Sequence, residues 1–496
     1  MHVKSLSAHM MYLFCCLLLL ASTTAHAQKK KKHVFVGEKK IKIKDLDKGI
    51  EELIQGSSVP AMSLALINNN EVVYHNTYGI TQYPDGKEVN NETVFCGGSL
   101  SKTYLLFAAY WLADRDILDL DKPVYQYLEN PRLDHDERYK LITTRMILNH
   151  SSGIENWQFE NDPKKLEIMI DPGSGFVYSG EGFVYLSQVV EEILGETYEE
   201  YITRIVAEPL GLNLSRFALR EGEVEPDNYA TNHNAFKDNR PSKLAEIPKP
   251  AHGIYFTAEE YAKLIIACFD TTKLSPESIK NFTYLPDTLG PDISKSGVDM
   301  YRASGFYVLK TKENTAIHVI GAGDGNFSVL AYSPSRKVGV IFMTNSGAGY
   351  FVGKRVAELA MDFDIDWTFR FDLEWQYPSI PVRLIGKYDK ESADPLLAEM
   401  DEIYGKGDVP YKEFVPPGEF FYGTNRAIAD DYLQKLIQLY PNESWSYKML
   451  GKRYIRAANY NEAITLLEKA QANGAEDDDF AGMIEECKVQ LAKSPD

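Results

Sequence analysis

Two side chains near residue 100 have the types and the spacing of a nucleophile and its base. Ser99 and Lys102 form the sequence Ser99-Leu100-Ser101-Lys102, and a three-residue spacing on a helix places both on one face. The stretch from Ser99 to Leu112 is apolar nearly all round, which predicts a helix buried in the protein centre. Burial lowers the pKa of a lysine, so Lys102 can accept the serine proton, while the helix N-terminus favours a developing alkoxide. The residues therefore predict nucleophilic catalysis by Ser99, whose own N–H is placed to serve an oxyanion.

The segments around this pair resemble the serine β-lactamase and D-Ala-D-Ala peptidase superfamily. The similar segments follow the family order, and they are FCGGSLSKT (95–103), MILNHSSGI (146–154), AEPLGL (207–212) and HGI (252–254) before Thr257-Ala258. The resemblance covers residues 45–360. It implies a Ser99 acyl-enzyme and a substrate that is an ester, an amide or a D-amino-acid peptide, without choosing among them.

The second motif of that family, Tyr-x-Asn, falls on Tyr178-Ser179-Gly180. Tyr178 would then relay a proton between Ser99 and the leaving group. Gly180 departs from the pattern, because it has no amide to hold the carbonyl that the family's Asn contacts in β-lactams and peptides. The alternative interpretation is that Tyr178 is a core aromatic beside a tight turn.

The third motif, Lys-Thr-Gly or His-x-Gly on an edge strand, is disturbed in this chain. Counting back from the next strand puts Ile320-Gly321-Ala322 in its place. This count predicts the second oxyanion N–H at about Gly323 and makes His318 an ordinary strand histidine. Alternatively, His318 fills the motif, which requires the sequence GAGDGN to be rearranged. His150 is predicted to have a structural role, capping a turn in NHSSG.

The elements that position these residues form a predicted catalytic domain over residues 40–362. A helix over 43–54 leads into a hairpin of two strands, 62–67 and 71–78. Helices are predicted through 113–285, most clearly at 198–210 and 258–268. Four β-rich runs then precede a helix near 351–361, and they are 301–310, 316–320, 327–332 and 338–344. The prediction is an α/β fold of the β-lactamase/transpeptidase type, with a mixed, largely antiparallel sheet flanked by helices, a helical subdomain, and the active site between them.

The chain beyond residue 362 has a different pattern. Residues 363–425 are aromatic and contain proline, which predicts an irregular linker. Residues 426–496 have the 34-residue spacing of a tetratricopeptide repeat, with one full repeat, a partial one before it and a further helix over 478–492. An ordinary helical hairpin is the alternative. Arrays of so few repeats rarely stand alone, and they are therefore expected to pack on the catalytic domain or on that last helix. They also offer a groove for a protein partner.

The N-terminus has the features of a cleaved signal peptide over residues 1–27. Lys4 precedes an apolar run from Met10 to Ala21, and Ala25-His26-Ala27 has the small-x-small pattern of a cleavage site. The run is shorter than the roughly 20 residues that span a bilayer, so a membrane anchor is the less favoured interpretation. We expect a periplasmic or secreted protein without a transmembrane span in the mature chain.

Composition and charge exclude several functions. The formal net charge of -18 disfavours nucleic acid as a partner, since phosphate contacts need clustered Lys and Arg. The sequence has no H-E-x-x-H and no C-x-x-C, and acyl transfer through a serine requires neither a metal nor a cofactor.

Two hypotheses of different class follow. The first is a serine hydrolase that transfers an acyl group to water, with esterase or amidase activity favoured over β-lactamase activity because Gly180 and the third motif lack the expected polar groups. The alternative is an inactive β-lactamase-like fold that acts as a binding or scaffolding protein through its repeats.

Overall fold

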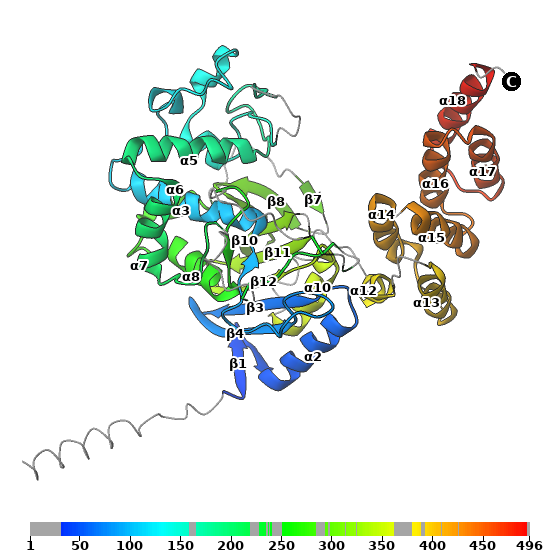
Figure 1. Ribbon diagram of the computed structural model, residues 1–496, viewed down its shortest axis with the longest axis horizontal. Coiled ribbons are helices and arrows are strands. Elements are labelled where there is room, and N and C mark those ends of the chain that lie inside the picture. The colour runs from blue at the N-terminus through cyan, green and yellow to red at the C-terminus, as the bar shows by residue number, and fades with distance from the viewer. Residues whose placement is uncertain are drawn as a thin grey trace, which may run out of the picture.

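The computed structural model describes residues 31–157, 165–218, 228–234, 237, 239–240, 250–283, 293–295, 298–312, 314–323, 325–361, 379–387, 392–407, 409–424 and 426–493. The predicted signal peptide, residues 1–27, lies outside the described residues. Figure 1 shows an α/β body and a group of C-terminal helices beside it, with α12 (Ser379–Gly386) between the two.

The α/β body is built on an antiparallel sheet that has eight strands among the described residues. The strands, in the order in which they lie across the sheet, are β4 (Glu71–Gly79), β3 (Ala61–Asn68), β12 (Val338–Thr344), β11 (Asn326–Ser333), β10 (Thr315–Gly323), β9 (Phe306–Lys310), β8 (Val298–Ala303) and β7 (Ile293–Lys295). The N-terminal strands β3 and β4 therefore join the sheet beside β12, from the other end of the domain's sequence, which confirms the predicted α/β fold.

The central strands are buried on both faces because helices cover both. Residues of β3 alternate between two cores, one formed with α3 (Lys102–Ala113) and α8 (Ala258–Cys268), the other with α2 (Ile43–Gln55) and α10 (Gly349–Ala360). The first core contains Ala61, Ala65 and Ile67, and the second Met62, Leu64 and Leu66. This alternation is the two-residue period of a strand, so β3 is buried at every position from Ala61 to Ile67 rather than at every second one.

Two hairpins show what the sequence predicted and what it missed. The β3–β4 hairpin is confirmed, and its turn residues Asn69 and Asn70 have φ of 53° and 60°, a region that Asn enters more readily than most residues. The run 301–310, predicted as one strand, is instead the β8–β9 hairpin. Ser304 and Gly305 form its turn, with Gly305 at φ 71°.

The helical subdomain lies between the nucleophile segment and β7. Its described helices are η2 (Val124–Gln126), η3 (Glu137–Leu141), α4 (Thr144–Leu148), α5 (Gly180–Leu194), α6 (Tyr198–Ile202), the π-helix η4 (Thr203–Ala207), α7 (Glu208–Leu210), α8 and α9 (Pro276–Lys280). Short paired strands also occur, β1 (His33–Val36) with β2 (Lys39–Lys42) and β5 (Phe95–Cys96) with β6 (Tyr255–Phe256). In Figure 1, α3 lies between α5 and the sheet, in agreement with their shared core.

The predicted linker over 363–425 is helical in its described part, so the prediction of irregular chain is wrong for those residues. This part contains α12, α13 (Asp394–Gly405), η5 (Tyr411–Glu413) and α14 (Val415–Thr424). Prolines suggested irregular chain, but Pro395 and Pro416 stand in the first turns of α13 and α14. Residues in a first turn have no intrahelical partner for their N–H, so proline is tolerated there.

The last helices are α15 (Arg426–Leu439), α16 (Ser444–Arg456), α17 (Tyr460–Ala472) and α18 (Asp479–Lys493). Gly451 lets α16 approach α17 closely, since a Cβ at this glycine would lie 3.1 Å from the Leu467 side chain. These helices fit both a tetratricopeptide repeat and an ordinary helical hairpin, so the repeat assignment stays a prediction.

Candidate active site

Ser99 lies in η1 (Gly98–Ser101), the single turn between β5 and α3, and is half-buried. Glycine allows strand β10 to approach this turn. A Cβ at Gly321 would lie 2.1 Å from the Gly97 carbonyl oxygen, and one at Gly98, where φ is 53°, would lie 2.9 Å from the Gly321 carbonyl carbon. The backbone of β10 is therefore placed directly beside the nucleophile turn.

Lys102 is 5% exposed at the first position of α3. Its Nζ lies 3.4 Å from Ser99 Oγ and donates a 2.7 Å hydrogen bond to the Ala251 carbonyl oxygen. Burial lowers the pKa of Lys102 to about 7. A substantial fraction of the amine is therefore neutral near neutral pH and able to accept the Ser99 proton.

Tyr178 precedes α5 and donates a 2.7 Å hydrogen bond from its hydroxyl to Ser99 Oγ. Burial raises the pKa of Tyr178 to about 12, although the bond to Ser99 acts in the opposite direction. The phenol therefore keeps its proton at neutral pH, which suits a donor better than a base. The structure thus brings together Ser99, Lys102 and Tyr178, three residues that the sequence analysis selected.

His150 positions Tyr178 and the start of α5. Its ring stacks on Tyr178 at 4.3 Å between centroids, and its Nδ1 accepts the backbone N–H of Ser179 at 3.1 Å. Burial, reinforced by the charges of Lys102 and Arg302, holds the pKa of His150 well below its usual value. A neutral ring with an accepting Nδ1 fits a structural role, although the N–H that it binds belongs to Ser179 and not to the predicted turn in NHSSG.

The segment that the count assigns to the third motif, Ile320-Gly321-Ala322, lies beside the nucleophile turn. His318 is buried in β10 and lines the same cavity as Ser99, together with Ile320 and Ala322. Gly323 is not among the residues lining that cavity, and it pairs with Asn326 at the end of the β10–β11 hairpin. Because Ala322 lines the cavity and Gly323 does not, the N–H of Ala322 is a second candidate for the oxyanion donor predicted at about Gly323.

Trp157 was not selected from the sequence, yet it contacts the second motif. A Cβ at Gly180 would lie 2.1 Å from the Trp157 ring, so the indole occupies the space of any side chain at position 180. A lone tryptophan 23 residues before a glycine carries no sequence signal of that contact.

The cavity beside Ser99 has a volume of about 390 Å³. Its lining is mainly apolar and includes Phe176, Met300, Phe306, Leu309 and Val319. Arg302 also lines it, with its guanidinium carbon 3.2 Å from the centroid of the Phe176 ring. The cavity can therefore hold an apolar group next to a cation.

Ser63, His75 and Glu259 form a second arrangement with the residue types of a catalytic triad. Ser63 Oγ lies 3.2 Å from His75 Nε2, and His75 Nδ1 lies 3.4 Å from Glu259. The hydrogen bond from His75 lowers the pKa of Glu259 to about 2. Ser63 is fully buried and accepts the Ala258 N–H at 3.2 Å, so this group joins β3, β4 and α8 rather than meeting a substrate.

The geometry around Ser99 has a nucleophile, a lysine of lowered pKa and a protonated tyrosine, which are parts needed for acyl transfer. Within the described residues, no group of three or more His, Cys, Asp or Glu side chains is arranged to hold a metal ion. None of the described helices combines the length and hydropathy needed to cross a bilayer.

Comparison with protein families gives a match to the family model described as Beta-lactamase, over residues 46–363. This is more than half of the chain and includes every residue of the site.

Curated relatives are more distant. Penicillin-binding protein 4* of Bacillus subtilis (strain 168) is 26% identical over 180 residues, which is 32% of this chain and 39% of that protein. Protein flp of Staphylococcus aureus (strain COL) is 21% identical over 334 residues, which is 62% of this chain and 64% of that protein. In both cases the match spans less than two thirds of the relative.

Solved structures share the fold. The octameric penicillin-binding protein homologue from Pyrococcus abyssi has a TM-score of 0.51 and 22% identity, covering 70% of this chain and 80% of that one. A class C beta-lactamase has a TM-score of 0.51 and 21% identity, covering 61% of this chain and 90% of that one.

Proposed function

The chain belongs to the Beta-lactamase family, and from this membership we propose that it is an exported serine hydrolase that forms an acyl-enzyme on Ser99. The observation that carries the proposal is that Ser99 Oγ has both a buried lysine at 3.4 Å and a tyrosine hydroxyl at 2.7 Å. The proposed roles are nucleophile for Ser99, base for Lys102 and proton relay for Tyr178.

Each step follows from the state of these groups. Neutral Lys102 takes the proton of Ser99, and Oγ attacks the acyl carbon. The carbonyl oxygen becomes an oxyanion that the N–H groups of Ser99 and Ala322 stabilise. The bond to the leaving group then breaks as Tyr178 protonates it and regains a proton from Lys102. Water attacks the ester in the same way, and Ser99 leaves with its proton restored.

The substrate class we favour is a simple ester or amide rather than a β-lactam or a D-alanyl peptide. At the second motif, Gly180 offers no amide to a substrate carbonyl. At the third motif, the two residues before Gly321 are Val319 and Ile320. Their side chains offer a substrate neither a charged group nor a hydroxyl. A site that lacks polar partners loses the substrates that depend on them.

Two further parts of the proposal rest on sequence features. Export rests on the signal peptide predicted over residues 1–27. A protein partner, if the enzyme has one, is expected at the helices over 426–496, where the repeat pattern predicts a groove.

The test is the intact mass of the mature protein after brief exposure to p-nitrophenyl acetate, a fluorophosphonate or a penicillin. We expect the ester and the fluorophosphonate to add mass to the wild-type protein and to Ser174→Ala, a control at an exposed serine of the same domain. Ser99→Ala should stay unmodified. A stable penicillin adduct would favour a peptidase instead. No Ser99-dependent adduct with any reagent would overturn the proposal and favour the scaffolding hypothesis.

A further inference from the structure

A short segment, residues 155–157, is strapped across the N-terminus of α5. The Glu155 carbonyl oxygen accepts the Ser179 hydroxyl at 2.9 Å, and Asn156 Oδ1 accepts the Gly180 N–H at 2.8 Å. The Asn156 carbonyl oxygen also accepts the Glu181 N–H at 3.0 Å. These three bonds fix the backbone on which Trp157 is carried.

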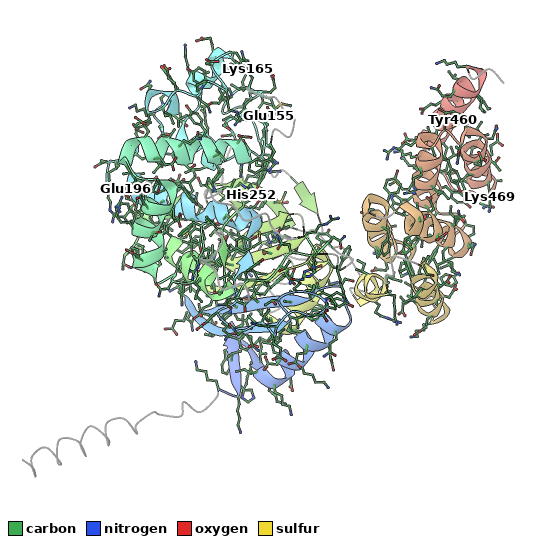
Figure 2. The ribbon with its side chains drawn as sticks, viewed as in Figure 1. Glu155, Lys165, Glu196, His252, Tyr460 and Lys469 are labelled. Atoms are coloured by element: carbon green, nitrogen blue, oxygen red, sulfur yellow. The ribbon has the colours of Figure 1, made fainter. Side chains whose placement is uncertain are left out.

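The Trp157 indole fills the space beside Gly180. A Cβ at Gly180 would lie 2.1, 2.3 and 2.5 Å from the ring carbons Cζ2, Cη2 and Cε2. The indole also meets the His252 ring edge-on, at 5.0 Å between centroids and 80° between planes. Figure 2 labels His252 near the centre of the α/β body, and its neighbour Ala251 accepts the hydrogen bond from Lys102. The indole therefore extends from the second motif to the segment that holds the base.

We propose that Trp157 is a specificity-determining residue that selects acyl groups without an amide, so that the substrates are carboxylic esters with apolar acyl chains. This inference rests on the proposed Ser99 hydrolase. The indole carbons that face Gly180 neither donate nor accept a hydrogen bond, so an acylamino group lying against them would be desolvated without a partner. An apolar chain in the same place loses no hydrogen bond and gains contact with the ring.

The same geometry couples positions 157 and 180. An Asn at position 180 has no room while the indole is present, and removal of the indole alone leaves Gly180 without an amide. Recognition of an acylamino group should therefore appear only when both residues change. The effect of the double variant on ester preference should therefore exceed the sum of the two single effects. A general loss of packing at Trp157 would give no such excess.

The experiment compares two esters with the same leaving group and nearly the same shape, p-nitrophenyl pentanoate and p-nitrophenyl N-acetylglycinate. For the wild type we expect kcat/KM to favour the pentanoate by roughly 10-fold or more. Trp157→Ala should bring the ratio close to one. The combination of Trp157→Ala with Gly180→Asn should reverse it in favour of the acetylglycinate. Trp111→Ala, which removes an indole near the far end of α3, should leave the ratio unchanged.

Separate outcomes test the function and the inference. If neither ester is cleaved in a Ser99-dependent way, the proposed function and this inference are both wrong. If the pentanoate is cleaved through Ser99 but Trp157→Ala and the double variant keep the wild-type ratio, only the inference is overturned. Should Trp157→Ala fail to fold, Trp157→Gln puts a hydrogen-bonding amide in the place of the indole, and the ratio should again move toward the acetylglycinate.

Discussion

Lys102 shows how one buried residue is made reactive at the expense of stability. Its Nζ is removed from water and has Ala251 as the acceptor of its single short hydrogen bond, with the rings of Tyr178 and Phe183 at 4.9 and 5.6 Å. Desolvation lowers the pKa of Lys102 even though these contacts favour the charged amine. The same burial that yields a neutral base therefore also penalises the protonated folded state.

This burial predicts the pH dependence of catalysis. Lys102 must be neutral to accept the Ser99 proton, so kcat/KM for an ester should rise with pH and reach half its plateau near pH 7. No loss is expected up to about pH 10, because Tyr178 keeps its proton until about pH 12. Steady-state rates from about pH 5 to 10 test this. Tyr178→Phe should lower the plateau but keep the midpoint, and a flat profile would contradict the base role of Lys102.

Burial of Lys102 also predicts that replacing this residue by an apolar one abolishes activity but raises stability. The folded-state pKa lies below the unfolded value of 10.5, so the unfolded chain binds more protons between about pH 7 and 10.5, and stability rises with pH in that window. Below pH 7 Lys102 is also protonated in the folded state, so the full free-energy cost of burying its charge is present. Lys102→Met should therefore abolish activity yet melt about 5 °C higher than the wild type at pH 6. The gap should close above about pH 10, and a Lys102→Met protein that melts lower at pH 6 would contradict the argument.

At the scale of elements, the site depends on how closely β10 approaches η1. Gly321→Ala puts a Cβ 2.1 Å from the Gly97 carbonyl oxygen, and backbone cannot yield as a side chain can. The strand should move away from Ser99, with a loss of roughly 100-fold in kcat/KM from the displaced oxyanion donor. Steady-state kinetics and the rate of fluorophosphonate labelling measure this loss. Gly405→Ala, at a position with open space, is the matched control, and equal effects in both variants would contradict the argument.

The elements also show where sequence patterns stop being informative. Helix 258–268 was predicted to the residue, and Ser99, Lys102 and Tyr178 were found through local motifs, because spacing along the chain carries that information. The residue that supplies the second N–H could not be read from local spacing, since the approach of β10 to η1 brings together Gly321 and Gly97, which are far apart in sequence. Trp157 was missed because its contact with Gly180 is made only by the folded chain.

At the scale of the whole molecule, the catalytic domain and the C-terminal helices share a core through α12. Ile380, Leu384 and Ile385 belong to the apolar cluster that also contains residues of α2, β3 and α10. The Ser58 hydroxyl donates a 3.1 Å hydrogen bond to the Ile385 carbonyl oxygen, and Gly386 lies against the Gly56 backbone. By contrast, a separate cluster of residues from α15 to α18 stabilises the last helices.

These two cores predict different effects for the same kind of substitution. Leu384 and Leu467 are both fully buried, so replacing either by alanine should cost about 2–5 kcal/mol. Leu384→Ala should lower the temperature at which Ser99-dependent esterase activity is lost, because its core continues beneath β3 and α10. Leu467→Ala should unfold the last helices earlier, as seen by circular dichroism, while that temperature of activity loss stays at the wild-type value. If both variants lose activity at the same lowered temperature, the catalytic domain and the last helices unfold together. The two cores would then not be independent.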